Sequence, residues 1–320
     1  MMSNYCIACN QPAETKVEAV NWGFASVSVS TYSYYRCPNC GSLFRADNDI
    51  DYDLIYNDEY GNYEETLKKT VYGNKFSKKI RNLRNAYAYM NKHRVVGGVI
   101  NRLKPAFIPL PARFMKKISE GAKLLDVGCR YGIVDYMLKD VGANVSGIEP
   151  YLDKDIEYDN GLVIKKLFID EVDDKYDIIL YDNVFEHLET PVNDLRAAAE
   201  RLRHDGSIVL VFPGYGTMTK LYGEYSYIIQ PPQHVCLYTE KGVNEVAKAS
   251  GLKVVDISRT SILQWYLKSY WIQHRLGLTT GHYTIRELEK RIPHDELSII
   301  KERIKSSTEG DLFTVELKVI

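Results

Sequence analysis

One short run constrains the fold of this 320-residue chain more than any other segment. It reads LLDVGCRYG over residues 124–132, and a second apolar run ends at Glu149. This order predicts a buried strand, a tight glycine turn, the start of a helix, and then a second strand that ends at a carboxylate. In open α/β sheets, that arrangement holds nucleoside ligands at the carboxyl ends of the strands. The run therefore predicts an α/β domain that binds a nucleoside cofactor.

The spacing of the glycines distinguishes between classes of cofactor. The dinucleotide fingerprint G-x-G-x-x-G would require glycine at positions 128, 130 and 133, but Arg130 and Ile133 occupy the last two. A nicotinamide or flavin dinucleotide is disfavoured, because its pyrophosphate must approach the backbone closely at these positions. What remains is a D-x-G-x-x-x-G pattern over residues 126–132, with an acid downstream.

Four segments in this order resemble the class I S-adenosylmethionine-dependent methyltransferases. They are the glycine run, the acid after the second strand, the fourth-strand segment YDIILYDNVFEHL at 176–188, and the turn into the fifth strand at 202–213. The resemblance covers about residues 118–258 and resumes at the C-terminus. It implies a Rossmann-like sheet of seven strands in the order 3-2-1-4-5-7-6, with the last strand antiparallel.

The apolar runs agree with that fold. They predict strands at 123–127, 144–148, 162–166, 176–180, 207–212 and 253–257. The C-terminal segment alternates apolar and polar residues from Phe313 to Val319, as expected for an antiparallel strand. Thr190 followed by Pro191 predicts the start of a helix that runs to Arg203, and a second helix is expected from 239 to 250.

The resemblance also implies a cofactor site for S-adenosylmethionine at the carboxyl ends of the strands. Glu149 would accept hydrogen bonds from both ribose hydroxyls, and either Phe168 or Asp170 would contact the adenine. Arg130 departs from the family, which usually has glycine there, and its guanidinium would either bind the cofactor carboxylate or crowd the pocket. The implied cofactor-binding residues are Asp126, Gly128, Arg130, Gly132, Glu149, Phe168, Asp170 and Asp182.

Four of the six cysteines form two C-x-x-C pairs, Cys6 with Cys9 and Cys37 with Cys40. Each pair has the spacing of a zinc knuckle, and two short hairpins have too little core to fold without a metal. The pattern therefore predicts a zinc ribbon with four thiolate ligands. Iron is a less favoured alternative, since the second pair also resembles the knuckle of rubredoxins.

The sequence suggests three regions. Residues 1–47 would form the zinc ribbon, 48–117 a connector that is rich in tyrosine and then basic, and 118–320 the methyltransferase domain with an insertion at about 259–309. From residue 66 to 119 there are fourteen lysines and arginines and no acidic residue, although the whole chain has a formal charge of -1. The basic stretch predicts a helix with an exposed cationic face, a path for a phosphorylated or nucleotide-linked substrate, or a nucleic-acid contact. The aromatic residues at 262–276 predict a lid, a homodimer interface or packing on the chain's own core.

Two histidines follow strands that would deliver residues to the active site. His234 lies in a segment that resembles a substrate-facing segment of the family, and His187 follows Glu186 after the fourth strand. Histidine is the side chain best suited to accept a proton from an acceptor at neutral pH. We therefore predict His234 as a catalytic base or substrate-orienting residue, with His187 as the second candidate.

The combination of ribbon, connector and core resembles bacterial sugar and natural-product methyltransferases. The predicted function is methyl transfer to a small polar acceptor, such as a sugar, a nucleotide sugar or a related glycan or natural-product intermediate. An RNA methyltransferase and a non-catalytic binding protein with a degenerate cofactor site are the alternatives. No apolar run approaches the ~20 residues needed to span a bilayer, and the N-terminus lacks the pattern of a signal peptide. These features predict a cytoplasmic protein.

Overall fold

The computed structural model describes residues 4–20, 31–46, 69, 73–108, 110–276, 283–306 and 309–320. The chain divides into two compact units that interleave along the sequence. Unit 1 comprises residues 1–58, 183–196 and 210–320, and unit 2 comprises residues 59–182 and 197–209. The tyrosine-rich segment at 51–60 lies outside the described residues, and the three predicted domain boundaries stay predictions. No helix in the described ranges is both long and apolar enough to cross a membrane.

Unit 2 is built around parallel strands whose central side chains are buried. β4 (Lys123–Val127) pairs in parallel with β5 (Asn144–Ile148) on one side and with β8 (Tyr176–Asp182) on the other. β7 (Val163–Lys165) continues the parallel sheet beyond β5, and the two-residue β6 (Ile156–Glu157) is antiparallel to it. Leu124, Leu125 and Ile178 have no exposed surface, as expected for parallel strands that are covered on both faces.

The complete sheet confirms the predicted topology. Its hydrogen-bonded order is β11-β12-β9-β8-β4-β5-β7-β6, which is the order 3-2-1-4-5-7-6 with β6 added at one edge. β9 (Leu202–Pro213) has residues in both units, and β12 (Leu312–Val319) is antiparallel to β11 (Leu252–Thr260). Two predictions need correction. The sheet has eight strands, and helix α6 (Pro191–Glu200) ends before Arg203, because β9 already begins at Leu202.

The basic stretch of unit 2 is helical, as predicted. Its helices are α2 (Lys75–Met90), α3 (Arg94–Leu103) and α4 (Ala112–Ser119). The Asn74 side chain caps α2 by accepting a hydrogen bond from the backbone N–H of Phe76. The Phe76 side chain is 70% exposed, so this apolar residue lies outside the buried face of the helix.

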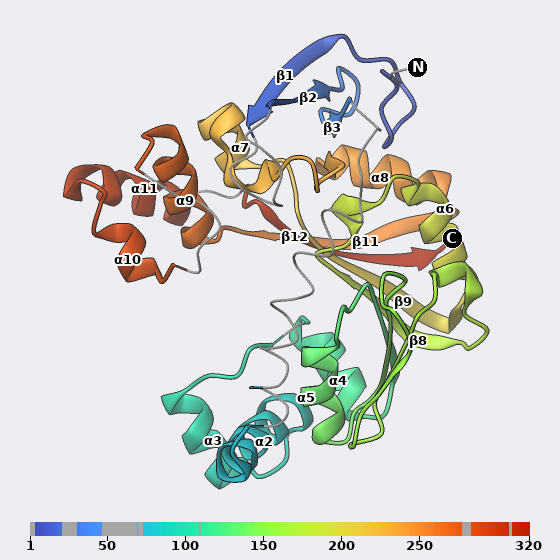
Figure 1. Ribbon diagram of the computed structural model, residues 1–320. Helices are drawn as coiled ribbons and strands as arrows, with labels where there is room; N and C mark the ends of the chain where they lie inside the picture. Colours follow the sequence, from blue (N-terminus) through green and yellow to red (C-terminus); the bar gives the residue numbers. More distant parts are fainter. Residues whose placement is uncertain are drawn as a thin grey trace. The chain divides into compact units, whose positions relative to one another are not determined.

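The N-terminal strands of unit 1 form a second, smaller sheet (Figure 1). β1 (Thr15–Val20) and β2 (Thr31–Arg36) pair antiparallel, as the alternating sequence predicts. β3 (Leu43–Arg45) adds to β2, and β10 (Cys236–Leu237) adds to β3. A strand that is two hundred residues away in sequence therefore belongs to the same sheet as the cysteine-rich segment.

The insertion forms a helical group in unit 1, α9 (Leu263–Gln273), α10 (Ile285–Glu289) and α11 (His294–Ser306), which lie together in Figure 1. Tyr266, Tyr270 and Trp271 are buried in a core cluster with side chains of β2, β3 and α7 (Thr217–Tyr222). These aromatic side chains are covered by residues of the same chain, so they need no partner to shield them from water. The remaining long helix of unit 1 is α8 (Glu240–Ala249), which Thr239 caps.

Candidate functional site

The glycine turn of unit 2 has the backbone conformation that its sequence predicts. Gly128 and Gly132 have φ angles of +70° and +59°, in the left-handed region that glycine enters without steric cost. Arg130 lies between them with φ of +54°. The glycine that the family usually has at this position is therefore explained by the turn, and Arg130 holds a conformation that is costly for a residue with a Cβ.

Glu149 lies directly against this turn. Its carboxylate is buried, and its Oε2 accepts a hydrogen bond from the backbone N–H of Arg130 at 3.1 Å. Its Oε1 accepts one from the backbone N–H of Tyr151, also at 3.1 Å. A carboxylate oxygen can accept two hydrogen bonds, so these contacts orient the group and remain compatible with hydroxyl donors from a ribose.

Further carboxylates gather beneath the turn. Asp126 and Asp135 are both buried, and Asp135 lies in the first turn of α5 (Ile133–Asp140). Burial raises the pKa of Asp126 well above its usual range, and the charges of Asp135 and Asp182 raise it further. Burial also raises the pKa of Asp135 to about 7, although hydrogen bonds with Asp126 and Cys129 lower it. The charge of Asp182, at the end of β8, raises the pKa of both carboxyls.

These residues fit a cationic nucleoside such as S-adenosylmethionine, whose sulfonium and ammonium groups carry positive charge. Buried carboxylates with raised pKa values gain from a cation placed beside them. The turn also leaves no room for larger side chains, since a Cβ at Gly147 would come within 2.4 Å of Cys129 Sγ. Cys129 and Gly147 thus pack against each other below the turn, which agrees with the small residue expected at position 129.

The two candidates for adenine contact are both exposed to solvent. Phe168 has 54% of its surface exposed, and Asp170 is exposed in the short 3-10 helix η1 (Ile169–Glu171). The backbone N–H of Phe168 donates to the Glu171 carboxylate at 2.7 Å, so the start of η1 is ordered by Glu171. Neither residue is distinguished from the other by these contacts, and both stay candidates.

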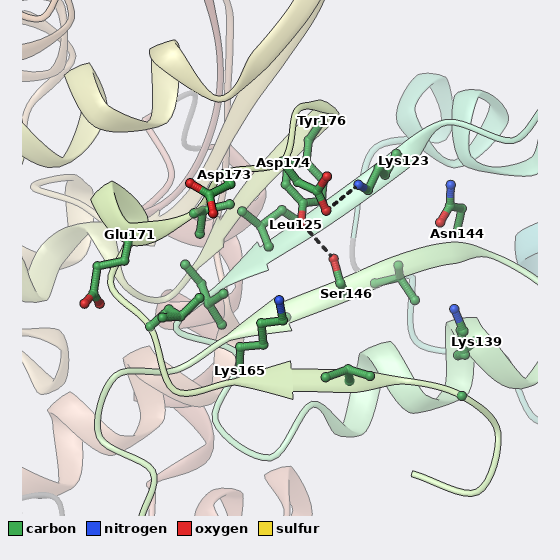
Figure 2. Close-up of a pocket in the computed structure, with 17 residues that line it drawn as sticks. Lys123, Leu125, Lys139, Asn144, Ser146, Lys165, Glu171, Asp173, Asp174 and Tyr176 are labelled. Atoms are coloured by element: carbon green, nitrogen blue, oxygen red, sulfur yellow. Dashed lines mark hydrogen bonds and ion pairs between the residues drawn. The ribbon is translucent and has the colours of Figure 1, made fainter. Parts of the chain in front are cut away.

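A separate hollow of about 270 Å³ lies on one face of β4, β5 and β7 (Figure 2). Lys123 forms an ion pair with Asp174 there at 2.9 Å, and the Ser146 hydroxyl donates to the Tyr176 hydroxyl at 3.3 Å. The connection from β7 to β8 contains only η1 in place of a long helix, and residues of this connection line the hollow. None of the predicted cofactor residues lies in its lining.

The four predicted metal-binding cysteines converge in unit 1. Cys6 Sγ lies 3.6 Å from Cys40 Sγ, and Cys9 Sγ lies 3.5 Å from Cys37 Sγ. Four sulfurs at the usual zinc distance would be about 3.8 Å apart in a tetrahedron, so the thiols already have nearly the required spacing. The backbone N–H of Cys40 points at Cys37 Sγ at 3.4 Å, as in a zinc knuckle. The residues therefore fit a metal ion with four thiolate ligands.

The two predicted catalytic histidines also lie together in unit 1, on either side of a buried glutamate. The rings of His187 and His234 meet edge to face with centroids 4.8 Å apart. Their Nε2 atoms lie 3.7 and 3.9 Å from Oε1 of Glu186, which has no exposed surface. Burial lowers the pKa of His234 to about 4, although a hydrogen bond with the Ile228 carbonyl raises it, so this ring is neutral at neutral pH.

The cysteine-rich segment holds the backbone on both sides of His234. The Tyr34 hydroxyl donates to the His234 carbonyl at 2.8 Å, and the buried Arg45 guanidinium donates to the Pro232 carbonyl. Arg45 also pairs with Glu189 at 3.3 Å. The cysteine-rich segment is thus part of the support of the histidine loop.

Two residues of these sites were not predicted from the sequence. Glu186 is predicted only as the neighbour of His187, and no prediction covers Asp135. An acidic side chain in the first turn of the helix after the glycine turn is the signal that could have found Asp135, because its charge favours the helix N-terminus. Glu186 becomes recognisable only when the loop around residue 234 is placed beside it.

Comparison with known proteins agrees with the site in unit 2. A family profile described as "Methyltransferase domain" matches residues 100–257, nearly half of the chain. Ubiquinone biosynthesis O-methyltransferases are among the curated relatives. The enzyme of Hydrogenovibrio crunogenus is 26% identical, and the match covers 42% of this chain and 60% of the relative. The enzyme of Stutzerimonas stutzeri is 22% identical, and the match covers 40% of this chain and 58% of the relative. The match therefore spans about three fifths of these relatives.

Solved structures of methyltransferases are among those that resemble this chain. A S-adenosylmethionine-dependent methyltransferase from Archaeoglobus fulgidus has a TM-score of 0.40 and 14% identity over 64% of this chain and 89% of its own. Mitomycin 7-O-methyltransferase has a TM-score of 0.40 and 12% identity, and the match covers 73% of this chain and 60% of that enzyme. The strand order and the profile match agree: residues 100–257 match a methyltransferase domain, and the sheet has the strand order expected for class I methyltransferases.

Proposed function

We propose that the chain transfers the methyl group of S-adenosylmethionine to a hydroxyl oxygen of a small polar acceptor, of the class of sugars, nucleotide sugars or related glycan and natural-product intermediates. The observation that carries the proposal is the cluster of Glu186, His187 and His234. A hydroxyl must lose its proton when it is methylated, and this cluster offers imidazole and carboxylate groups that can take it. The names of the curated relatives support an oxygen acceptor and add an aromatic hydroxyl as a second class.

The cofactor roles in this proposal follow the geometry of unit 2. Glu149 binds the ribose hydroxyls, and the glycine turn lies along the methionine part of the cofactor. Asp126 and Asp182 balance its positive charge, and the Arg130 guanidinium binds its carboxylate. Phe168 or Asp170 contacts the adenine. S-adenosylmethionine itself supplies the electrophilic methyl group, so the protein contributes mainly position and proton removal.

The cysteine cluster is proposed to hold a structural zinc ion. Its four ligands leave no open coordination position, which is typical of structural and not of catalytic zinc. In this proposal, the ion stabilises the small sheet that supports the loop of His234.

The direct test measures S-adenosylhomocysteine formation with a panel of nucleotide sugars, free sugars and catechols. A signal with one class that is lost in His234→Ala or in His187→Ala, while cofactor affinity is kept, supports the proposal. Turnover that is unchanged in both variants would remove these histidines from the reaction.

The basic surface of unit 2 favours RNA as a second acceptor class. A hollow of about 470 Å³ beside α2 is lined by basic residues that include Lys78, Arg81, Arg84 and Lys104. Filter binding to RNA over a salt series tests this alternative, since contacts with phosphates give affinity that falls steeply as salt rises. Absence of binding at low salt would remove it.

A further inference from the structure

The arrangement around Glu186 points to more than a proton acceptor. In both histidines, Nδ1 faces a main-chain carbonyl. His187 Nδ1 lies 3.0 Å from the Gln233 carbonyl, and His234 Nδ1 lies 2.7 Å from the Ile228 carbonyl. A carbonyl oxygen can only accept a hydrogen bond, so Nδ1 carries the proton in each ring. With the proton on Nδ1, the Nε2 atom of a neutral ring carries the lone pair.

Both lone-pair nitrogens face the same carboxylate oxygen. The distances from His187 Nε2 and His234 Nε2 to Glu186 Oε1, 3.7 and 3.9 Å, are longer than a hydrogen bond. Three acceptor atoms thus converge in a largely buried place, where a positive charge between them would be favourable. Two ligands bonded to one ion at about 2.1 Å lie roughly 3.0–3.4 Å apart. The three ligand atoms here lie within 4.8 Å of one another, so small rotations of the side chains would bring them onto one ion.

The surroundings also resemble those of metal ligands in proteins. Histidines that bind metals usually donate the other ring N–H to a carbonyl or carboxylate, which fixes the tautomer and the direction of the ring. Here both rings do so through main-chain carbonyls. The Glu186 backbone is fixed as well, because its carbonyl accepts from the backbone N–H of Val235 at 2.8 Å.

We propose that Glu186, His187 and His234 form a second metal site, which binds a divalent first-row transition-metal ion such as zinc and offers open coordination positions to an oxygen of the acceptor. Imidazole ligands favour such metals over magnesium or calcium. Three protein ligands leave positions for other groups, in contrast to the four thiolates of the cysteine cluster. The side chain of His187 is 17% exposed, and this is the side from which an acceptor would approach.

The metal site itself does not depend on the proposed function, but its role in binding the acceptor does. A metal-bound imidazole has committed its lone pair to the ion and cannot act as a base. In the metal-bound enzyme, the ion would lower the pKa of the acceptor hydroxyl, so that its proton could pass to solvent water. The oxygen would then bond to the methyl carbon while the carbon–sulfur bond of S-adenosylmethionine breaks and S-adenosylhomocysteine leaves.

The experiment measures zinc per chain by mass spectrometry of the full-length protein after equilibration with zinc and removal of the excess. The variants are Glu186→Gln and His187→Ala, and the control is His204→Ala, whose side chain is 96% exposed in unit 2. The wild type and the control are expected to hold about one zinc more than either variant, while the zinc of the cysteine cluster is kept in all four proteins.

Equal zinc content in the wild type and in both variants would overturn the proposal and leave a shared proton between the three groups. Circular dichroism shows which variants are folded. If Glu186→Gln does not fold, the zinc content of His187→Ala decides, since His187 is the most exposed of the three residues. Calorimetry with S-adenosylmethionine on the same samples separates the two proposals. A wild type that holds the additional zinc but binds no cofactor would keep the metal site and remove its role in methyl transfer.

Discussion

Arg130 is the residue at which this chain departs most clearly from the family that it resembles, and the structure gives the departure a physical meaning. Its backbone has φ of +54° in the turn that also carries Gly128 and Gly132. A left-handed residue with a Cβ costs about 1–2 kcal/mol relative to glycine. A residue that keeps such a cost is expected to contribute through its side chain, and here the cofactor carboxylate is the proposed partner.

We expect Arg130→Gly to raise the free energy of unfolding by up to about 1 kcal/mol, because the turn is relaxed, and to weaken S-adenosylmethionine binding about tenfold, because a charged hydrogen bond is lost. Arg130→Asn is the matched control, since asparagine tolerates the left-handed region and has no charge. Chemical denaturation and calorimetry measure the two effects. Tighter binding in both variants would show that the guanidinium crowds the pocket.

Asp135 gives the cofactor site a predicted pH dependence. Burial holds the pKa of this carboxyl at about 7 in the free protein, well above its value in an unfolded chain. A cation bound beside it favours the ionised form, so below pH 7 a proton must leave when the cofactor binds. Affinity for S-adenosylmethionine is therefore expected to fall as the pH drops below about 7, by at most about tenfold per pH unit.

Calorimetry from pH 8 to pH 5.5 measures this dependence, and Asp135→Asn should make it much weaker. A wild-type affinity that stays constant over this range would contradict the role of the buried carboxylates.

At the scale of elements, the main connection is the pairing of β3 with β10. Leu43 pairs with Leu237 and Phe44 with Cys236, two residues beyond His234. The backbone N–H of Arg45 also donates a hydrogen bond to the Val235 carbonyl at 2.8 Å. If the four cysteines bind zinc, as proposed, the ion would hold the turns next to β2 and β3. We therefore expect the order of the histidine loop to depend on the cysteine cluster.

Removal of zinc with a chelator should increase hydrogen exchange in residues 234–239 as well as in the cysteine-rich segment. The reason is that β10 loses its partner strand when β3 is no longer held. Exchange followed by mass spectrometry measures it, and α5 of unit 2 serves as an internal reference. If exchange rises only at the cysteines, the ribbon does not support the histidine loop.

The elements also show which features a sequence can reveal. Strands β4 and β5 were predicted with their observed bounds, because a buried parallel strand is a short apolar run between glycine and polar residues. β6 has only two residues and no such pattern. Phe76 of α2 is exposed although it is apolar, since the elements that cover a helix are distant in sequence and are not fixed by the periodicity of the helix itself.

At the scale of the whole molecule, the order of the strands and the cysteine cluster could be predicted, and the composition of the histidine site could not. The glycine turn and Glu149 are close in sequence and are joined by adjacent parallel strands, so their contact follows from the fold. Glu186 and His234 are 48 positions apart, and their approach depends on the loop that the ribbon supports. Contacts of this kind carry no local signal.

The central claim is that the glycine turn and Glu149 together bind S-adenosylmethionine. Calorimetry of the full-length chain and of Glu149→Ala tests it most directly, with circular dichroism to establish that the variant is folded. The account predicts one cofactor bound per wild-type chain and an affinity at least about tenfold weaker in the variant, because hydrogen bonds to a charged group contribute about 1.5–3 kcal/mol. No binding to the wild type at about millimolar ligand, or equal affinity in both proteins, would contradict it.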